Sequence, residues 1–382
     1  MATTARIDVK DQGPLGAIRE LGHHMLESGD IQALLVAKRL PRQGSVMPAL
    51  ISDPAELEEA DPLSPAFPLN AAKLVSRLTK GETRGRIGAI LRPCEIRAFV
   101  ELVKLNQGSM EDVLLLSLDC FGALPNNEYS ALVRQEGTAA LTERYLKAVQ
   151  EGHETVTATF PLAPACAICE HPVAEAADLH IGLAGVDLSK HLLLQANTAR
   201  GEGLLTRLGY QDCPEPPAHR QALEGLRSSK KTARDACFAA TQEATTDLDK
   251  LSEYLAGCVN CYNCRVACPV CYCKECVFVT DVFDHRPTQY LGWANRQGSL
   301  KLPTDTVFFH LTRLAHMSLS CVGCGQCSNA CPNNIPIMEL FRTVAQNTQN
   351  AFGYVPGRNP DEPIPLSVFS EEEFEEVVDH LA

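Results

Sequence analysis

Long apolar runs are missing from this sequence of 382 residues. No stretch of about 18 apolar residues without charge occurs, and such a stretch is what a transmembrane helix needs. The first residues, MATTARIDVKDQG, also lack the basic flank and apolar segment of a signal peptide. We therefore expect a cytoplasmic protein with no membrane insertion.

Positive charge is scarce as well. Lys and Arg together number 34 against 47 Asp and Glu, which gives a formal net charge of -13 at pH 7. Nucleic-acid binding needs a basic surface to neutralise phosphates, so this composition argues against it. An acidic run, SEEEFEEVVDH, lies near the end of the sequence. Residues 346–382 are expected to form an acidic C-terminal tail that faces solvent or a partner.

The usual nucleotide fingerprints are absent from the first 250 residues, where neither G-x-G-x-x-G nor a Walker motif occurs. The length still allows two or three domains, and a hydrophobic content of 45% is typical of a globular protein. Any cofactor in this part must therefore be recognised by other features.

Cysteine, by contrast, is abundant, with 17 residues. Thiols in a reducing compartment are normally kept reduced, so metal binding is a better explanation than a disulfide framework. Seven of these cysteines fall within residues 257–278, GCVNCYNCRVACPVCYCKECVF.

Two stretches share the spacing C-x2-C-x2-C-x3-C followed by proline, at residues 258–269 and 321–332. In ferredoxin-like proteins, three thiolates of such a run hold one 4Fe-4S cluster and the fourth ligates the neighbouring cluster. By this rule cluster one takes Cys258, Cys261, Cys264 and Cys331, and cluster two takes Cys321, Cys324, Cys327 and Cys268. Residues 251–345 are thus predicted to form an α+β ferredoxin-like domain.

Structural zinc is the alternative, but it usually takes two separated C-x2-C pairs and needs only four ligands. The segment between the motifs contains a predicted helix, DTVFFHLTRLAHMSLS, whose apolar residues recur at helical intervals. His310 and His316 on this helix are expected to be packing or surface residues, because cysteine already supplies the ligands.

Three cysteines of the first stretch, Cys271, Cys273 and Cys276, belong to neither motif. They could hold three corners of a third cluster if a distant cysteine supplied the fourth ligand. The candidates for that ligand are Cys94, Cys120, Cys166 and Cys169. Buried free thiols, which behave as small hydrophobes, are the alternative.

Residues 1–250 alternate short apolar runs with helical patterns. A strand over 87–91, a helix after Pro93 and a strand in EDVLLLSLDCFG predict a right-handed crossover in a parallel sheet. IQALLVAKRL predicts another strand, and KHLLLQANTARGEGLLTRLGY predicts a strand followed by a helix. The fold class is therefore an α/β domain followed by the iron–sulfur domain.

The Arg92-Pro93-Cys94 corner joins a strand to a helix, where free backbone N–H groups can bind an anion. Arg92 could contact a pyrophosphate, and Asp119 and Cys120 would line the same crevice. An ordinary tight turn explains the corner equally well.

Three segments of this half, LRPCEIRAFVEL, LDCFG and CAICEHPVAEAADLHIG, carry a family resemblance when taken together with the 4Fe-4S motifs. They resemble the β-subunit family of deazaflavin-coenzyme-reducing hydrogenases and formate dehydrogenases, in the branch that accompanies heterodisulfide-reductase-like complexes. The resemblance implies an FAD-binding domain over residues 1–250. It places Pro93 and Cys94 near FAD and Cys120 at the end of the adjacent strand, with Cys166 and Cys169 in the same domain.

This resemblance implies an electron-transfer subunit in which FAD exchanges electron pairs and the clusters carry single electrons. The implied partners are a catalytic dehydrogenase or hydrogenase subunit, or heterodisulfide-reductase-like subunits. The two-cluster module after the flavin domain departs from the simpler family pattern, so a nicotinamide or a neighbouring subunit could replace the deazaflavin. Two alternatives are a flavin-free ferredoxin-like conduit with an α/β docking scaffold and a zinc-bearing interaction module.

Overall fold

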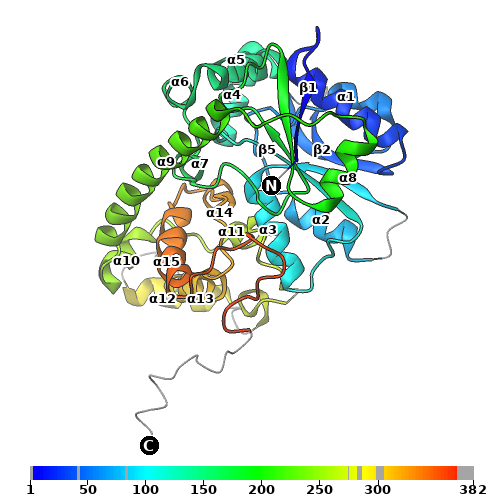
Figure 1. Ribbon diagram of the computed structural model, residues 1–382. Helices are drawn as coiled ribbons and strands as arrows, with labels where there is room; N and C mark the ends of the chain where they lie inside the picture. The colour runs from blue at the N-terminus through cyan, green and yellow to red at the C-terminus, as the bar shows by residue number, and fades with distance from the viewer. Residues whose placement is uncertain are drawn as a thin grey trace, which may run out of the picture.

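The computed structural model describes residues 3–40, 44–81, 85–273, 275–281, 286–297 and 305–367. The acidic run at residues 370–380 lies outside these ranges. Figure 1 shows a sheet domain in blue to green and a group of yellow and orange helices at its side, with the long helix α9 running along the left edge from the region of α4 down to α10.

The strands are β1 (Thr3–Asp8), β2 (Ala33–Leu40), β3 (Ser45–Ile51), β4 (Ile87–Leu91), β5 (Val113–Leu118), β6 (Leu179–Gly182) and β7 (His191–Ala196). They form one seven-stranded sheet in the order β1-β7-β6-β5-β4-β2-β3. Its centre is parallel, since β2 pairs with β4, β4 with β5 and β5 with β6 in that sense. The predicted parallel crossover from β4 to β5 is confirmed. Both edges are antiparallel, through β3 on β2 and through β7 and β1 beyond β6.

The helices of the sheet domain are α1 (Gly13–Glu27), η1 (Pro54–Glu59), α2 (Ala72–Thr79), α3 (Pro93–Lys104), α4 (Asn126–Glu136), α5 (Thr138–Glu151), α6 (His153–Thr159), α7 (Pro164–Ala167), α8 (Ala199–Arg207) and α9 (Pro217–Ala244). Those that follow are α10 (Leu248–Tyr254), α11 (Asn263–Ala267), η2 (Val277–Val279), α12 (Pro287–Gln297), α13 (Asp305–Met317), α14 (Gln326–Asn329) and α15 (Ile337–Ala351). Helix α13 confirms the helix predicted between the cysteine motifs.

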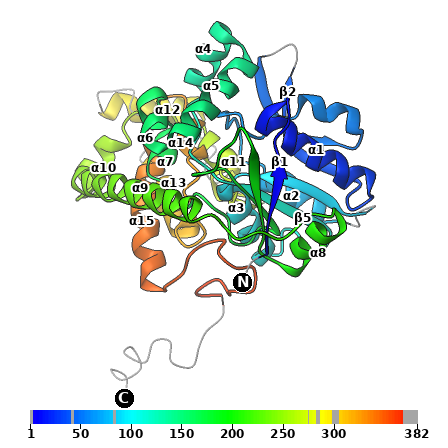
Figure 2. The ribbon, with the colours of Figure 1, turned by 45° about the horizontal axis from the view of Figure 1, so that its top comes forward.

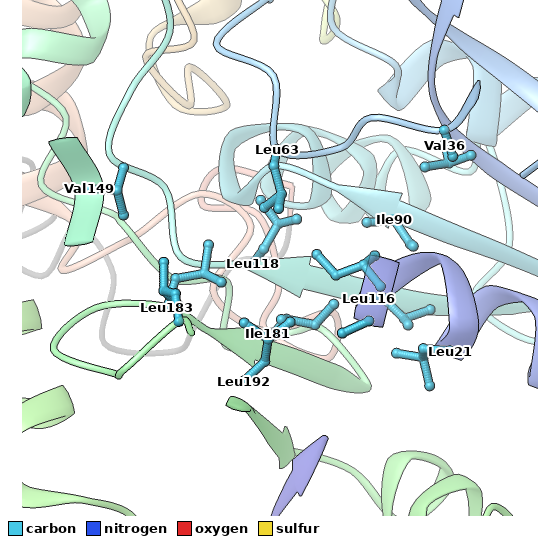
Figure 3. Close-up of a cluster of buried hydrophobic side chains, with 14 of the residues drawn as sticks. Leu21, Val36, Leu63, Ile90, Leu116, Leu118, Val149, Ile181, Leu183 and Leu192 are labelled. Atoms are coloured by element: carbon cyan, nitrogen blue, oxygen red, sulfur yellow. The ribbon is translucent and has the colours of Figure 1, made fainter. Parts of the chain in front are cut away.

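Every residue of β5 is buried, and successive side chains of a strand point to opposite faces. Leu114, Leu116 and Leu118 enter the core on one face, which also contains side chains of α1 and α5. Figure 3 shows part of this core, with Leu21 of α1 near Leu116. A central strand buried on both faces explains the nearly continuous apolar run that the sequence shows there.

The core on the other face is shared with the iron–sulfur domain. Val113 and Leu115 of β5 belong to the same apolar cluster as Phe309 of α13 and Phe341 of α15. Helix α15 also packs against α9. Figure 2, turned from the first view, again shows α10, α12, α13 and α15 together on one side of the sheet domain. The cysteine-rich segment therefore lies against the sheet domain through a continuous apolar core.

Candidate functional site

Helix α3 begins at the corner that the sequence singled out. Pro93 takes the first helical position, where its missing N–H costs nothing. Glu95 accepts hydrogen bonds from the backbone N–H of Arg92, at 2.8 Å, and from that of Ala71, also at 2.8 Å. These contacts fix the start of the helix and with it the position of Cys94.

Three of the cysteines predicted for cluster one affect the pKa of the fourth, Cys264. Burial is the main cause that raises the pKa of the Cys264 thiol to about 11. Arg313 opposes this rise, whereas Cys258, Cys261 and Cys331 add to it. Cys331, the fourth cysteine of the second motif, is thus close enough to the first motif to affect the Cys264 thiol, which agrees with the predicted exchange of ligands.

The four cysteines predicted for cluster two line one pocket. Its lining cysteines are Cys268, Cys321, Cys324 and Cys327. Gly325 has a φ of +75°, and a Cβ there would lie 2.4 Å from the Cβ of Ala165. Glycine is therefore required for this loop to approach the sheet domain so closely. A soft, all-sulfur donor set around one pocket fits an iron–sulfur cluster.

The sheet domain contributes a second four-cysteine pocket. Cys94, Cys120, Cys166 and Cys169 all line it, together with Cys324 from the cluster-two loop. Burial raises the pKa of Cys94 well above its usual value, and the neighbouring Cys324 adds to the effect. Burial, followed by the neighbouring Cys120, raises the pKa of Cys166 to about 11. The sequence named each of these cysteines as a candidate but did not bring the four together as one set.

The side chain of Arg92, which was expected to contact a pyrophosphate, forms hydrogen bonds with the protein. Its guanidinium donates to the backbone oxygens of Ser64, at 2.6 Å, and Ala66, at 3.0 Å. It also lies 3.7 Å from the sulfur of Cys120. The guanidinium of Arg92 thus forms its hydrogen bonds with protein groups beside the four-cysteine pocket.

The carboxylate of Asp119 also forms its hydrogen bonds with protein groups. Its carboxylate accepts from the ring nitrogens of His180, at 2.8 Å, and His219, at 3.1 Å. The backbone N–H groups of Leu183 and Ala184 also donate to it, at 2.7 and 2.8 Å. The side chains of Asp119, His180 and His219 form a buried group that sequence analysis missed, because His219 is 100 residues from Asp119 along the chain.

A larger pocket lies between the two domains and encloses about 690 Å³. Its walls include the start of α4 and the segments around α7, α14 and the start of α15. Amide side chains from both domains line it: Asn126, Asn127, Gln326, Asn329 and Asn334. Cys166 of the four-cysteine pocket and Cys324 of the cluster-two pocket both reach its wall. Volumes of this size are typical of cofactor and ligand sites.

The remaining cysteines of the first stretch lie elsewhere. Cys271 and Cys276 are partly buried against the apolar cluster that contains Phe309 of α13, and Cys273 is exposed. None of the three is among the described residues that line the four-cysteine pocket. His310 of α13 is buried and its Nε2 lies 3.5 Å from the sulfur of Cys258, whereas His316 is exposed. His310 therefore contacts a predicted ligand rather than serving only in packing.

No helix within the described ranges is both long enough and apolar enough to cross a membrane.

Comparison with known proteins assigns two parts of the chain. Residues 254–335 match the 4Fe-4S dicluster domain. Residues 85–213 match a family described as the C terminus of the beta subunit of coenzyme F420 hydrogenase/dehydrogenase. The second match includes Cys94, Cys120, Cys166 and Cys169.

Two curated relatives match over nearly their whole length. The F420-dependent formate dehydrogenase subunit beta of Methanocaldococcus jannaschii is 25% identical, over 90% of this chain and 91% of its own. The F420-dependent formate dehydrogenase 1 subunit beta of Methanococcus maripaludis is also 25% identical, over 91% and 92%. A chain of the F420-reducing [NiFe] hydrogenase complex from Methanosarcina barkeri aligns with a TM-score of 0.45 and 14% identity, covering 65% of this chain and 94% of that one.

The cysteine sets, the dicluster match and the full-length relatives agree with one another. The matched relatives are oxidoreductase subunits, and the predicted resemblance to the β-subunit family of deazaflavin-coenzyme-reducing hydrogenases and formate dehydrogenases is confirmed. The chain is an oxidoreductase subunit that resembles the beta-subunit family of coenzyme F420 hydrogenases and dehydrogenases and contains a 4Fe-4S dicluster domain.

Proposed function

We propose that the chain is the electron-transfer subunit of a multi-subunit oxidoreductase, in which FAD and three 4Fe-4S clusters connect a two-electron reaction with one-electron steps. The observation that carries this proposal is the position of Cys324. It lines the cluster-two pocket, the four-cysteine pocket and the large pocket between the domains. Three candidate cofactor sites therefore meet at one residue.

The candidate cluster sites are contiguous. Arg313 contacts Cys264 of the cluster-one set and also lines the cluster-two pocket. Cys324 then joins the cluster-two pocket to the four-cysteine pocket. When bound, clusters at these sites would carry single electrons, and the surrounding protein would set their potentials through hydrogen bonds and burial.

A third cluster is assigned to Cys94, Cys120, Cys166 and Cys169. A complete set of four thiols around one pocket supports this assignment. The alternative set of Cys271, Cys273 and Cys276 still needs a ligand from elsewhere, and one of its members is exposed. On this proposal these three cysteines are structural thiols.

FAD is assigned to the large pocket rather than to the Arg92 corner. The pocket volume of about 690 Å³ and the five amide side chains suit an extended polar cofactor. The pocket also meets the N-terminus of α4, whose free N–H groups suit a phosphate. The wall formed by Cys166 and Cys324 would put a flavin beside two clusters. A flavin-free conduit is the second candidate, because no Lys or Arg lies among the described residues of the lining.

The partners proposed for the chain follow from its relatives, which are named as subunits of F420-dependent formate dehydrogenase. A catalytic formate dehydrogenase or hydrogenase subunit is the proposed partner, and heterodisulfide-reductase-like subunits are a further one. The proposed place of action is the cytoplasm.

Iron, acid-labile sulfide and flavin content of anaerobically prepared protein tests the cofactor set. We expect about twelve irons per chain, the content of three 4Fe-4S clusters. The variant C169S should retain about eight, since it removes one ligand of the four-cysteine pocket. The matched variant C273S should keep about twelve. The opposite pattern, with iron lost in C273S and kept in C169S, would favour the alternative third-cluster set.

Flavin is tested in the same samples. FAD equimolar with the chain is expected, and A163W, which places a large side chain in the pocket wall, should lose it while keeping the full iron content. Full iron without flavin in the native protein would leave the flavin-free conduit as the function.

A further inference from the structure

Helix α13 lies in the segment between the two cysteine motifs and carries a buried cation. Only 4% of the surface of Arg313 is exposed. Within the described ranges, no carboxylate forms an ion pair with it, and its Nε has no hydrogen-bond partner. A buried charge without an opposite charge is costly. A nearby anion is therefore needed to stabilise the buried charge of Arg313.

The anions available are cysteine sulfurs. The Nη1 of Arg313 donates to the sulfur of Cys264 at 3.1 Å, and Nη2 donates to the backbone oxygen of the same residue at 3.2 Å. The rings of Phe309 and Phe341 lie 5.5 and 4.7 Å from the guanidinium carbon. These contacts hold the planar group in one orientation.

The same guanidinium faces the second predicted cluster. Arg313 lines the pocket formed by Cys268, Cys321, Cys324 and Cys327. Burial alone would lower the pKa of Arg313, but the neighbouring Cys264, followed by Cys268 and Cys327, raises it. One cation thus lies between a ligand of cluster one and the ligand pocket of cluster two.

We propose that Arg313 is a positioning residue shared by both clusters, which raises both reduction potentials and allows the two clusters to hold electrons at the same time. The inference rests on the two clusters of the proposed function. Each cluster takes up one electron on reduction and becomes more negative, so a fixed positive charge between the clusters stabilises the reduced state of each. A hydrogen bond to a ligand sulfur acts in the same direction.

A second donor on the same helix supports this role for α13. The Nε2 of His310, one turn before Arg313, lies 3.5 Å from the sulfur of Cys258. Two of the four predicted cluster-one ligands are therefore contacted by side chains of α13. On this proposal the helix between the motifs tunes the potentials of the clusters and does more than connect two loops.

The test is a redox titration of the full chain, followed by electron paramagnetic resonance of the reduced clusters. In R313Q, we expect lower midpoint potentials for both clusters of the dicluster domain and a larger fall for cluster one, which also loses its sulfur hydrogen bond. R313K keeps the charge without the planar fork, so its potentials should lie between those of R313Q and the native protein. The potential of the third cluster is expected to shift least.

The control is R296Q, which removes the same charge from an exposed position on α12 and should leave all potentials unchanged. Iron and sulfide are counted in each sample. A native protein without iron would contradict the proposed function itself. Full iron with native potentials in R313Q would overturn only the role of Arg313. If R313Q does not retain its clusters, R313M decides, because methionine fills most of the same space without the charge: native potentials for both clusters in R313M would also overturn that role.

Discussion

At the scale of single residues, the carboxylate of Asp119 organises a buried group next to Cys120. Burial alone would raise the pKa of Asp119, but hydrogen bonds from His180 and His219 hold it below its usual value. His219 also pairs with Glu215 at 2.9 Å. Burial lowers the pKa of His219, yet the bonds to Asp119 and Glu215 outweigh it and raise the pKa above 6.5. The histidine thus carries its proton more readily when the protein is folded.

The variant H219Q tests this linkage. A group whose pKa is raised on folding contributes stability that is full below its unfolded pKa and is lost as pH rises through its folded pKa. Below about pH 6.5, we expect H219Q to be less stable than the native protein by about 1.5–3 kcal/mol, the contribution of a hydrogen bond to a charged group. Thermal unfolding from pH 5.5 to 9 should show the difference shrinking as pH rises.

The exposed His316 supplies the control for that experiment, and H316Q should unfold at the native temperature across the range. A stability difference for H219Q that stays constant with pH would mean that His219 acts through packing and not through its charge.

Candidate site residues could be named from the sequence where the spacing of a motif alone identified them. The eight cysteines of the two motifs needed only their intervals and the following prolines. The hydrogen-bond partners of Arg92 and Asp119 could not be predicted, because they come from distant segments such as Ser64 and His219. The proposed role of Arg313 could not be predicted from the sequence, because no motif includes this residue and its role depends on tertiary contacts with both cysteine motifs.

At the scale of elements, α3 connects the corner at Pro93 to the segment after α15. The carboxylate of Glu101, which is fully buried, accepts from the hydroxyl of Tyr354 at 2.6 Å and from the backbone N–H of Gly357 at 2.8 Å. Gly357 has a φ of +74°, and a Cβ there would lie 2.3 Å from the backbone oxygen of Arg97. Residues 352–367 are therefore seated on α3 by specific contacts.

The variant Y354F removes one of these contacts without changing the ring. We expect it to lower the free energy of unfolding by about 1.5 kcal/mol, because Glu101 remains buried and loses one donor. Urea unfolding followed by circular dichroism measures the change. Y272F, at an exposed tyrosine, should change the stability little, and an equal loss in both variants would contradict the role of Glu101.

Elements with strong patterns were predicted well, and the sheet edges were not. The strands β2, β4, β5 and β7 and the helices α3, α8 and α13 follow from apolar runs and helical intervals. The pairing of β1 with β7 could not be predicted, because it joins segments nearly 190 residues apart and depends on tertiary packing. The 28-residue helix α9 was also missed, since few of its residues are buried and its apolar pattern is weak.

At the scale of the whole molecule, an ion-pair group joins the sheet domain to the iron–sulfur domain. Arg342 of α15 contacts both carboxylate oxygens of Glu170, at 2.9 and 2.8 Å. Arg234 of α9 contacts the same carboxylate at 3.0 Å. Burial alone would raise the pKa of Glu170, but Arg342, followed by His171, lowers it to about 2. Three separate segments therefore meet at one charged carboxylate.

The variant R342M keeps the bulk of the side chain and removes its charge. We expect a loss of about 3 kcal/mol, the lower end for a broken buried pair, because Arg234 still contacts Glu170. Thermal unfolding and limited proteolysis between the domains measure this loss. The control is R358M, which breaks an exposed pair with Glu362 and should cost less than about 1 kcal/mol. Equal effects of the two variants would exclude Glu170 as a junction between domains.

The order of the cysteines along the chain has a consequence for biosynthesis. The four cysteines of the sheet-domain pocket all precede residue 170, and β1 finds its neighbour β7 once residue 196 has left the ribosome. Domains generally fold from the N-terminus during synthesis, so these four cysteines can come together before any dicluster cysteine is made. On the proposed ligand sets, clusters one and two exchange Cys331 and Cys268, so both would have to wait for the second motif. We therefore expect the proposed third cluster to be inserted first and the other two to be inserted together.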